Sequence, residues 1–171
     1  MRLLRMPVLG ALAGLALIAP TQVRAQEKID LEGAISAVNG TRIELFGGIV
    51  SFEARGAKIE TDDENFTNVS DLKIGTVVEV EAVASLDGSI QATLIEVSDE
   101  KDAGPEVGGV IGTVDTAAQT FTIGPLTIAW DGQTKFKDLP RPQAGQLVEA
   151  AVQVSGGRLL ATTVEREEAR E

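Results

Sequence analysis

The residues with the clearest capacity for chemistry in this sequence are carboxylates gathered in one short polar stretch. The stretch carries four acidic and two amide side chains: Asp62, Asp63, Glu64, Asn65, Asn68 and Asp71. Hard cations such as Ca²⁺ take oxygen ligands from loops of this kind. The spacing does not match the calcium-loop pattern Asp-x-Asp-x-Asp-Gly with a closing Glu. The stretch therefore predicts a solvated polar loop or, as the alternative, a weak calcium-type site; no other cofactor is expected.

Two further features could bind or react. Trp130 directly precedes a turn at Asp131, which would bring it near a strand end, where it could serve as a platform for a sugar or a peptide. Core packing is the favoured interpretation, with Phe52 expected to fill the same place in an earlier copy of the pattern. Glu79 and Glu81 are two residues apart on an expected strand and point to one face, and a solvated sheet face is favoured over an acid–base pair, which needs different environments for its two carboxyls.

The composition removes several classes of catalytic site. The chain has no His and no Cys. It therefore lacks the commonest general base near neutral pH and the commonest metal ligand, and no disulfide can support the fold. Its Ser and Thr residues have no suitably placed His or Lys to activate them as nucleophiles. The sequence thus predicts a protein that is not an enzyme.

Residues 1–25 are typical of an export signal. Arg2 and Arg5 precede an apolar run over residues 8–19, and Val23 to Ala25 supply the small or apolar residues that a signal peptidase reads. The run is short for a membrane span, which needs roughly 20 residues, although a single anchor is the alternative. Cleavage after Ala25 would leave a periplasmic or secreted chain that has no membrane span.

The exported chain would be strongly acidic. Residues 1–25 hold three basic residues and no acidic one, so their removal changes the net charge from −11 to −14. Such a surface repels nucleic acids and anionic membranes and favours cations or basic partners. Only one Trp and five Phe are present for base stacking, and Phe52, Phe121, Phe136 and Trp130 alternate with polar residues as core positions do. Nucleic-acid binding is therefore not expected.

One pattern of strands occurs twice after the signal. The first copy starts at residues 33–39 and the second at residues 109–115, each with Gly, then Ile and Val on one face, then Asn or Asp. The later strands also match, in the pairs 42–45 and 120–123, 49–52 and 126–130, 72–82 and 143–152, and 92–96 and 161–165. Asp87-Gly88 and Gly156-Gly157 predict tight hairpins, because such turns need positive φ.

The repeat predicts an all-β protein made of two small modules. Period-two alternation over residues 76–83 is typical of a strand with one solvated face. Closing each small sheet into a barrel would remove its exposed edges. Leu72 is expected to plug one end of the first barrel, and Gly75 to let the chain turn. The expected segments are a first module at 29–98, a linker at 99–105, a second module at 106–166 and a charged tail at 167–171. Separate modules and modules packed side by side are both open.

The residues of both copies resemble a known family. Gly33 to Asn39, Ser70 to Val80 and Ala92 to Val97 are similar to the secreted bacterial domain-of-unknown-function family 5666, and the likeness covers nearly all of the chain after the signal as two copies. The second copy departs from the pattern at residues 140–142, where Pro-Arg-Pro replaces the Ser-Asp that precedes Leu72 in the first copy. The resemblance implies two tandem OB-like β-barrels and an exported protein. It supplies no functional residues.

These observations favour a non-enzymatic binding or scaffold module of the bacterial cell envelope. A barrel face or an exposed strand edge would hold an envelope protein or polymer. The alternative is an acidic, calcium-type cation-binding protein that uses the loop at residues 62–71. A fold of this kind hosts many functions and does not by itself choose between them.

Overall fold

A computed structural model describes residues 26–61, 66–98 and 104–168 of the chain, and its regular elements are strands and short 3₁₀ turns. The first copy contains β1 (Glu27–Asn39), β2 (Arg42–Leu45), β3 (Val50–Glu53), β4 (Lys58–Glu60), β5 (Val77–Ala84) and β6 (Ile90–Val97). The second contains β7 (Glu106–Asp115), β8 (Thr120–Ile123), β9 (Leu126–Ala129), β10 (Lys135–Lys137), β11 (Leu147–Ser155) and β12 (Arg158–Arg166). The 3₁₀ turns η1 (Phe46–Gly48) and η2 (Val69–Asp71) belong to the first copy.

Five strands of each copy close into a ring. In the first copy the pairing runs β1–β2–β3–β6–β5 and back to β1, with β3 and β6 parallel and the other pairs antiparallel. The second copy repeats this order as β7–β8–β9–β12–β11 and back to β7. This is the strand order of the OB-fold barrel, so the predicted fold class is confirmed. The short strands β4 and β10 pair in parallel with β6 and β12.

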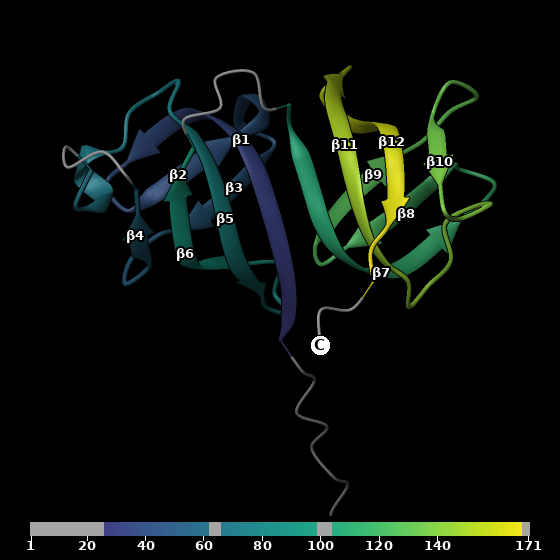
Figure 1. Cartoon of the computed structure of the whole chain (residues 1–171), viewed down its shortest axis with the longest axis horizontal. Helices are drawn as coiled ribbons and strands as arrows, with labels where there is room; N and C mark the ends of the chain where they lie inside the picture. Colours follow the sequence, from purple (N-terminus) through teal and green to yellow (C-terminus); the bar gives the residue numbers. More distant parts are fainter. Residues whose placement is uncertain (1–25, 62–65, 99–103, 169–171) are drawn as a thin grey trace, which may run out of the picture.

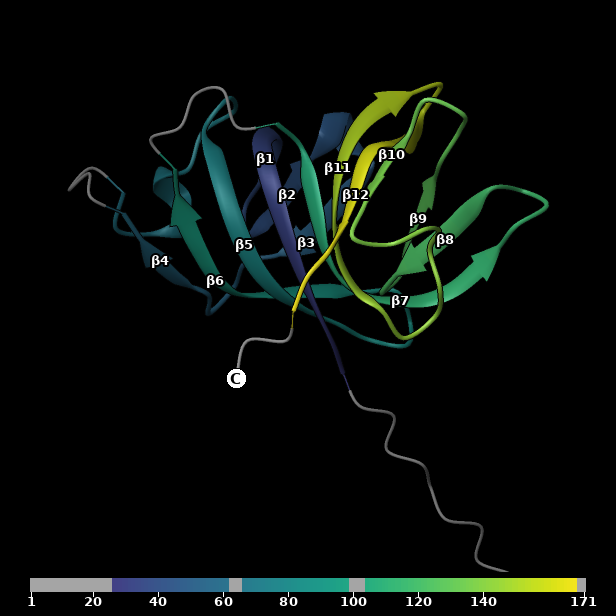
Figure 2. The same ribbon diagram turned by 45° about the vertical axis from the view of Figure 1, so that its right-hand side comes forward.

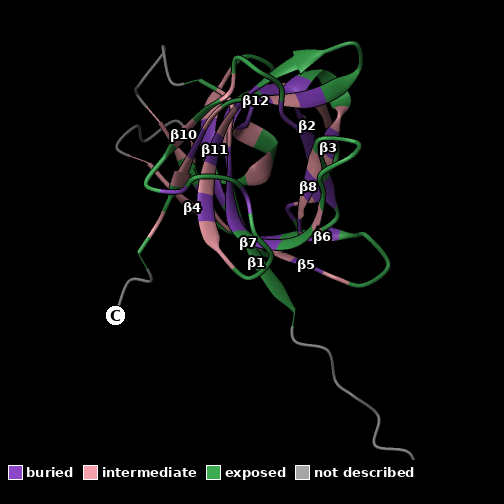
Figure 3. Ribbon diagram, turned by 90° about the vertical axis from the view of Figure 1, so that its right-hand side faces the viewer, coloured by how far each residue is buried: buried purple, intermediate pink, exposed green. Residues whose placement is uncertain are grey.

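The core of each barrel follows from period-two alternation. On β5 the side chains of Val78, Val80 and Ala82 are buried, whereas Glu79 and Glu81 are exposed. Figure 3 shows buried positions recurring along the strands in the same way. Leu72 is 3% exposed and belongs to the core, as expected for a residue that closes one end of the barrel. The described residues include no helix long and apolar enough to cross a membrane.

The two barrels are joined through their first strands. Residues 29–32 of β1 pair antiparallel with residues 106–109 of β7, and the pairing links all twelve strands into one sheet. Figures 1 and 2 show β1 and β7 side by side between the barrels. In each barrel the second strand covers only the later half of the first strand, so the early half would keep a free edge. The barrels cover this edge for each other, which removes an aggregation-prone feature.

Contacts outside the ladder strengthen the junction. The turn η1 of the first barrel contacts β11 of the second, and its residue Phe46 is only 5% exposed. A Cβ added at Gly33 would lie 2.7 Å from Phe46 Cε1, so glycine is needed for the ring to pack there. On the other side, Gly124 of the β8–β9 turn packs within van der Waals reach of Ala84 and Ile29. Because each barrel places a turn on the other, the modules form one unit.

Candidate functional site

A groove of about 600 Å³ lies where the barrels meet. Its walls are formed by β5 and β1 of the first barrel, by β7 and β11 of the second, and by the residues that follow β12. Nine acidic side chains and one basic side chain, Lys28, line it. The groove is therefore acidic because the junction brings together the solvated faces of four strands.

The strand register brings the carboxylates of different strands close together. Glu32 on β1 lies opposite Glu79 on β5 and opposite Glu106 on β7. Asp30 lies opposite Glu81 on β5 and opposite Gly108 on β7. Directly opposed residues of an antiparallel pair have Cβ atoms about 5 Å apart, so like charges at these positions destabilise the sheet. The junction therefore holds a row of carboxylates that barrel stability does not require.

The floor of the groove is less polar than its walls. Gly108 is buried, and a Cβ at this position would lie 3.3 Å from the Cβ of Asp30. Val110 is 46% exposed, and Leu147 beside it is half-buried. Apolar side chains between carboxylates can contact the methylene stems of Lys or Arg while the charged groups reach the acidic walls.

The carboxyl of Glu149 in the groove has a raised pKa. Burial and then a hydrogen bond and the charge of Glu106 raise the pKa of the Glu149 carboxyl, and the charge of Glu165 acts in the same direction. A hydrogen bond with Glu167 opposes these effects. Glu167 is held at the groove because its backbone N–H donates to the Leu147 carbonyl at 3.0 Å. The Glu149 carboxyl therefore binds a proton more readily than a solvated glutamate does.

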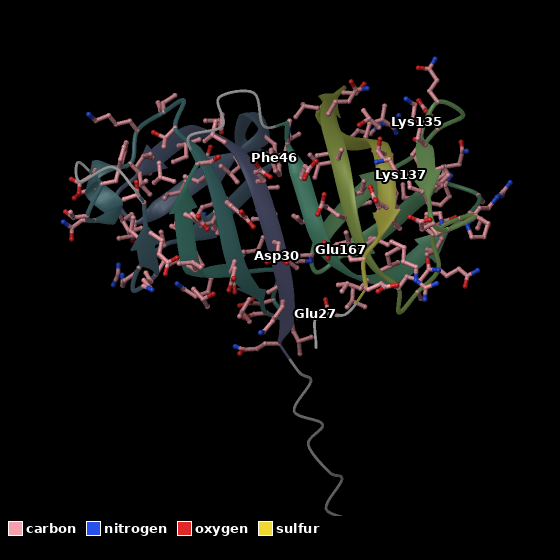
Figure 4. All side chains as sticks on the ribbon, viewed as in Figure 1. Glu27, Asp30, Phe46, Lys135, Lys137 and Glu167 are labelled. Atoms are coloured by element: carbon pink, nitrogen blue, oxygen red, sulfur yellow. The ribbon has the colours of Figure 1, made fainter. Side chains whose placement is uncertain are left out.

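The two lysines in the described part of the second barrel, Lys135 and Lys137, do not line the groove. Figure 4 shows Asp30 and Glu167 on either side of the junction, whereas Lys135 and Lys137 lie on the outer part of the second barrel. Lys137 Nζ is 2.8 Å from Glu165 Oε2, so its charge is already compensated. The charge of Lys137 also acts on Glu149, so these lysines offset the negative potential of the groove only at that edge.

The loop that could hold a cation is only partly described. Asp62, Asp63 and Glu64 lie outside the described residues. Asp71 Oδ2 accepts hydrogen bonds from the backbone N–H groups of Thr67 and Asn68, at 3.0 and 2.8 Å, and so caps η2. Among residues 26–61, 66–98 and 104–168, no three acidic side chains are grouped closely enough to hold a metal ion. The calcium site stays a prediction.

Trp130 lies in the core of the second barrel. It is 8% exposed, and its ring centroid is 6.0 Å from that of Phe121. Its exposed edge borders a hollow of about 310 Å³ beside Asp131 and Arg141. The expected equivalence with Phe52 is wrong: the N–H groups of Trp130 and Ala54 donate to the carbonyls of Gln119 and Thr41, which hold equivalent positions. The first barrel has only a methyl group where the second has an indole.

Sequence reasoning missed most of the groove. Glu79 and Glu81 were expected on a solvated face and are exposed there, but nothing in the pattern linked them to Asp30, Glu106 and Glu149. The available signal was the presence of acidic residues at equivalent positions of the two first strands, Asp30 and Glu106. These two positions indicate a shared acidic surface only when β1 is known to pair with β7.

The strand order and the shared junction define a tandem OB-barrel protein with an acidic groove between its barrels. The chain belongs to the family described as domain of unknown function DUF5666, whose profile matches residues 32–96 and 108–165. Comparison with curated proteins gives no match. Among solved structures, the chain is similar to Drosophila Unr CSD456, at 17% identity and a TM-score of 0.30. That match covers 86% of this chain and 65% of the other, and it carries no argument about function.

Proposed function

We propose that this chain is an exported, non-enzymatic binding module of the bacterial cell envelope, and that its groove holds a Lys- or Arg-rich segment of a partner protein. The observation that supports this proposal is the charge balance of the groove, with nine acidic side chains against Lys28 alone. Complementary charge raises association rates and excludes acidic partners. The export-signal pattern of residues 1–25 supports the location.

The size and composition of the groove support an extended segment as the occupant. A groove of about 600 Å³ is large enough for several side chains. Its carboxylates are spread over four strands, and no three of those in the described part converge as a metal site would require. Several separate positive charges match this spread better than one small ion does. Val110 and Leu147 would contact the aliphatic stems.

Calorimetric titration of residues 26–171 with a short peptide of alternating Lys and Val tests the proposal. Each exposed ion pair contributes ~0.2–1 kcal/mol, so Glu79→Gln/Glu81→Gln should weaken binding by roughly 2- to 30-fold at low salt. Glu44→Gln/Glu60→Gln removes the same charge outside the groove lining and is the matched control. If the two double variants weaken binding equally, the effect comes from net charge and not from the groove. Equal heat from a peptide of alternating Glu and Val would overturn the proposal.

A further inference from the structure

Glu106 and Glu149 lie at the point where the second barrel meets the first. On β7 and β11, Glu106 is opposite Ala151 and Glu149 is opposite Gly108, so the two glutamates are diagonal neighbours on one sheet face. Both side chains are half-buried, and a hydrogen bond with Glu106 is among the causes that raise the pKa of Glu149. Two carboxyl groups can share a hydrogen bond only when one of them carries a proton, because an ionised carboxylate has only acceptors. The diagonal placement and the half-burial of the two glutamates therefore favour retention of a proton by Glu149.

Glu106 also connects this pair to the first barrel. It is the register partner of Glu32 in the β1–β7 ladder. The repeat makes residue 108 the equivalent of Glu32 and residue 106 the equivalent of Asp30, so the symmetric counterpart of this contact is Asp30 opposite Gly108. Because residue 108 is glycine, the Asp30–Gly108 pair brings no like charges together, whereas the Glu32–Glu106 pair does. The charge of Glu106 thus acts on both barrels.

The surroundings of the pair are mainly acidic. The other charged groups that line the groove are Glu27, Lys28, Asp30 and Glu32 on β1, Glu79 and Glu81 on β5, and Glu167 and Glu168 after β12. Glu165 on β12 and Lys137 on β10, which are bonded to each other, also act on Glu149. Loss of a proton from the pair therefore adds negative charge to a region that already has an excess of it.

We propose that the Glu106–Glu149 pair is a proton-dependent switch between the barrels: uptake of a proton strengthens the β1–β7 contact, and its loss weakens that contact. This inference does not depend on a ligand in the groove. It predicts a module that tightens in mildly acidic surroundings and loosens as the pH rises.

The sign follows from the environment of Glu149. Because burial and Glu106 raise the pKa of Glu149 in the folded protein above the ordinary 4.5, the folded state binds more protons than the unfolded chain at pH values above 4.5. The contribution of Glu149 to the stability of the folded state therefore falls as the pH rises above that value. The pKa values of Asp71 and Asp87 are lowered by hydrogen bonds, so these groups act in the opposite sense. The effect of Glu149 is therefore measured by comparing the unaltered chain with its variants at the same pH.

Hydrogen exchange of residues 26–171 between pH 5 and pH 7.5 provides that test. After correction for the intrinsic rates, we expect exchange in segments 28–33 and 106–110 of the unaltered chain to be slower at pH 5, by up to about tenfold for each unit by which the pKa is raised. Glu149→Gln should show slow exchange at both pH values. Glu44→Gln, a half-buried strand glutamate outside the groove lining, should behave as the unaltered chain does.

Two outcomes would overturn the proposal. One is a change confined to β11 that leaves β1 unaffected, since the pair would then act only within its own barrel. The other is an unchanged pH dependence in Glu149→Gln. If this variant fails to fold, Glu106→Gln is measured in the same way, because it removes the same hydrogen-bonded pair through the other partner.

Discussion

Leu31 and Val107 lie opposite each other in the β1–β7 ladder and occupy equivalent positions in the two copies. A contact between equivalent residues marks a pseudo-twofold axis, as it does in a symmetric dimer. The exposed fractions of the two residues are 1% and 0%. The chain therefore resembles an isologous dimer whose halves are covalently linked.

The central position of Leu31 predicts a large effect of its truncation. Leu31→Ala should lower the free energy of unfolding by ~2–5 kcal/mol, because a buried side chain is removed at the junction. Urea denaturation of residues 26–171 measures this value. Leu86 is 75% exposed, so Leu86→Ala should change it by no more than ~0.5 kcal/mol. Equal effects of the two substitutions would contradict the assigned role of Leu31.

Gly109 should not tolerate a side chain. Its φ is +146°, and an added Cβ would lie 2.7 Å from Ile123 Cγ2 and 3.2 Å from the Lys28 carbonyl oxygen. Gly109→Ala is expected to lower the free energy of unfolding by ~1–3 kcal/mol through overpacking at the junction. A Cβ at Gly132 would meet nothing within 4 Å, so Gly132→Ala serves as the control in the same denaturation experiment. A Gly109→Ala variant as stable as the unaltered chain would contradict the assigned need for glycine at this position.

Trp130 is the only tryptophan, which makes its environment directly measurable. With 8% exposure it should resist quenching by acrylamide, and Trp130→Ala should lower the free energy of unfolding by ~3–5 kcal/mol. Fluorescence titration with oligosaccharides or peptides tests the platform hypothesis. A saturable change in emission would support a ligand site at the hollow beside Arg141, whereas an unchanged spectrum would leave Trp130 with its core role.

The Asp71 carboxyl should make the stability of the fold depend on pH in the acidic range. Hydrogen bonds from the backbone N–H groups of Thr67 and Asn68 lower the pKa of its carboxyl below 3.8. A lowered pKa contributes stability that is fully present above pH 3.8 and is lost as the pH falls through the folded value. Asp71→Asn should therefore lower the thermal midpoint at neutral pH and match the unaltered chain in strong acid. A constant difference at every pH would indicate a packing effect.

The loop at residues 62–71 makes a separate prediction about cations. If it binds Ca²⁺, titration of residues 26–171 should release saturable heat that Asp62→Asn/Asp63→Asn abolishes. The variant with Glu79→Gln/Glu81→Gln should keep that heat, because its substitutions lie in the groove. Absence of saturable heat in the unaltered chain would end the cation hypothesis.

The local features of the fold could be predicted from the sequence. Val78 and Val80 alternate with Glu79 and Glu81, and this pattern was sufficient to assign a half-buried strand. The Gly156-Gly157 turn was also predictable, because both residues have positive φ, at 59° and 75°. The sequence predicts Phe52 as the counterpart of Trp130, whereas the structure shows that Ala54 holds the equivalent position. Alternation does not reveal which strand positions correspond when loop lengths differ.

The sequence by itself determined that the protein has two copies of one β module, with alternating core positions and a strongly acidic composition. These properties are local or additive, so they can be derived from neighbouring residues and from composition. Only the tertiary structure decided that β1 pairs with β7, and hence that Glu106 faces Glu32 and contacts Glu149. That arrangement depends on which free strand edges meet and in which register, and residues about 76 positions apart carry no local signal of it.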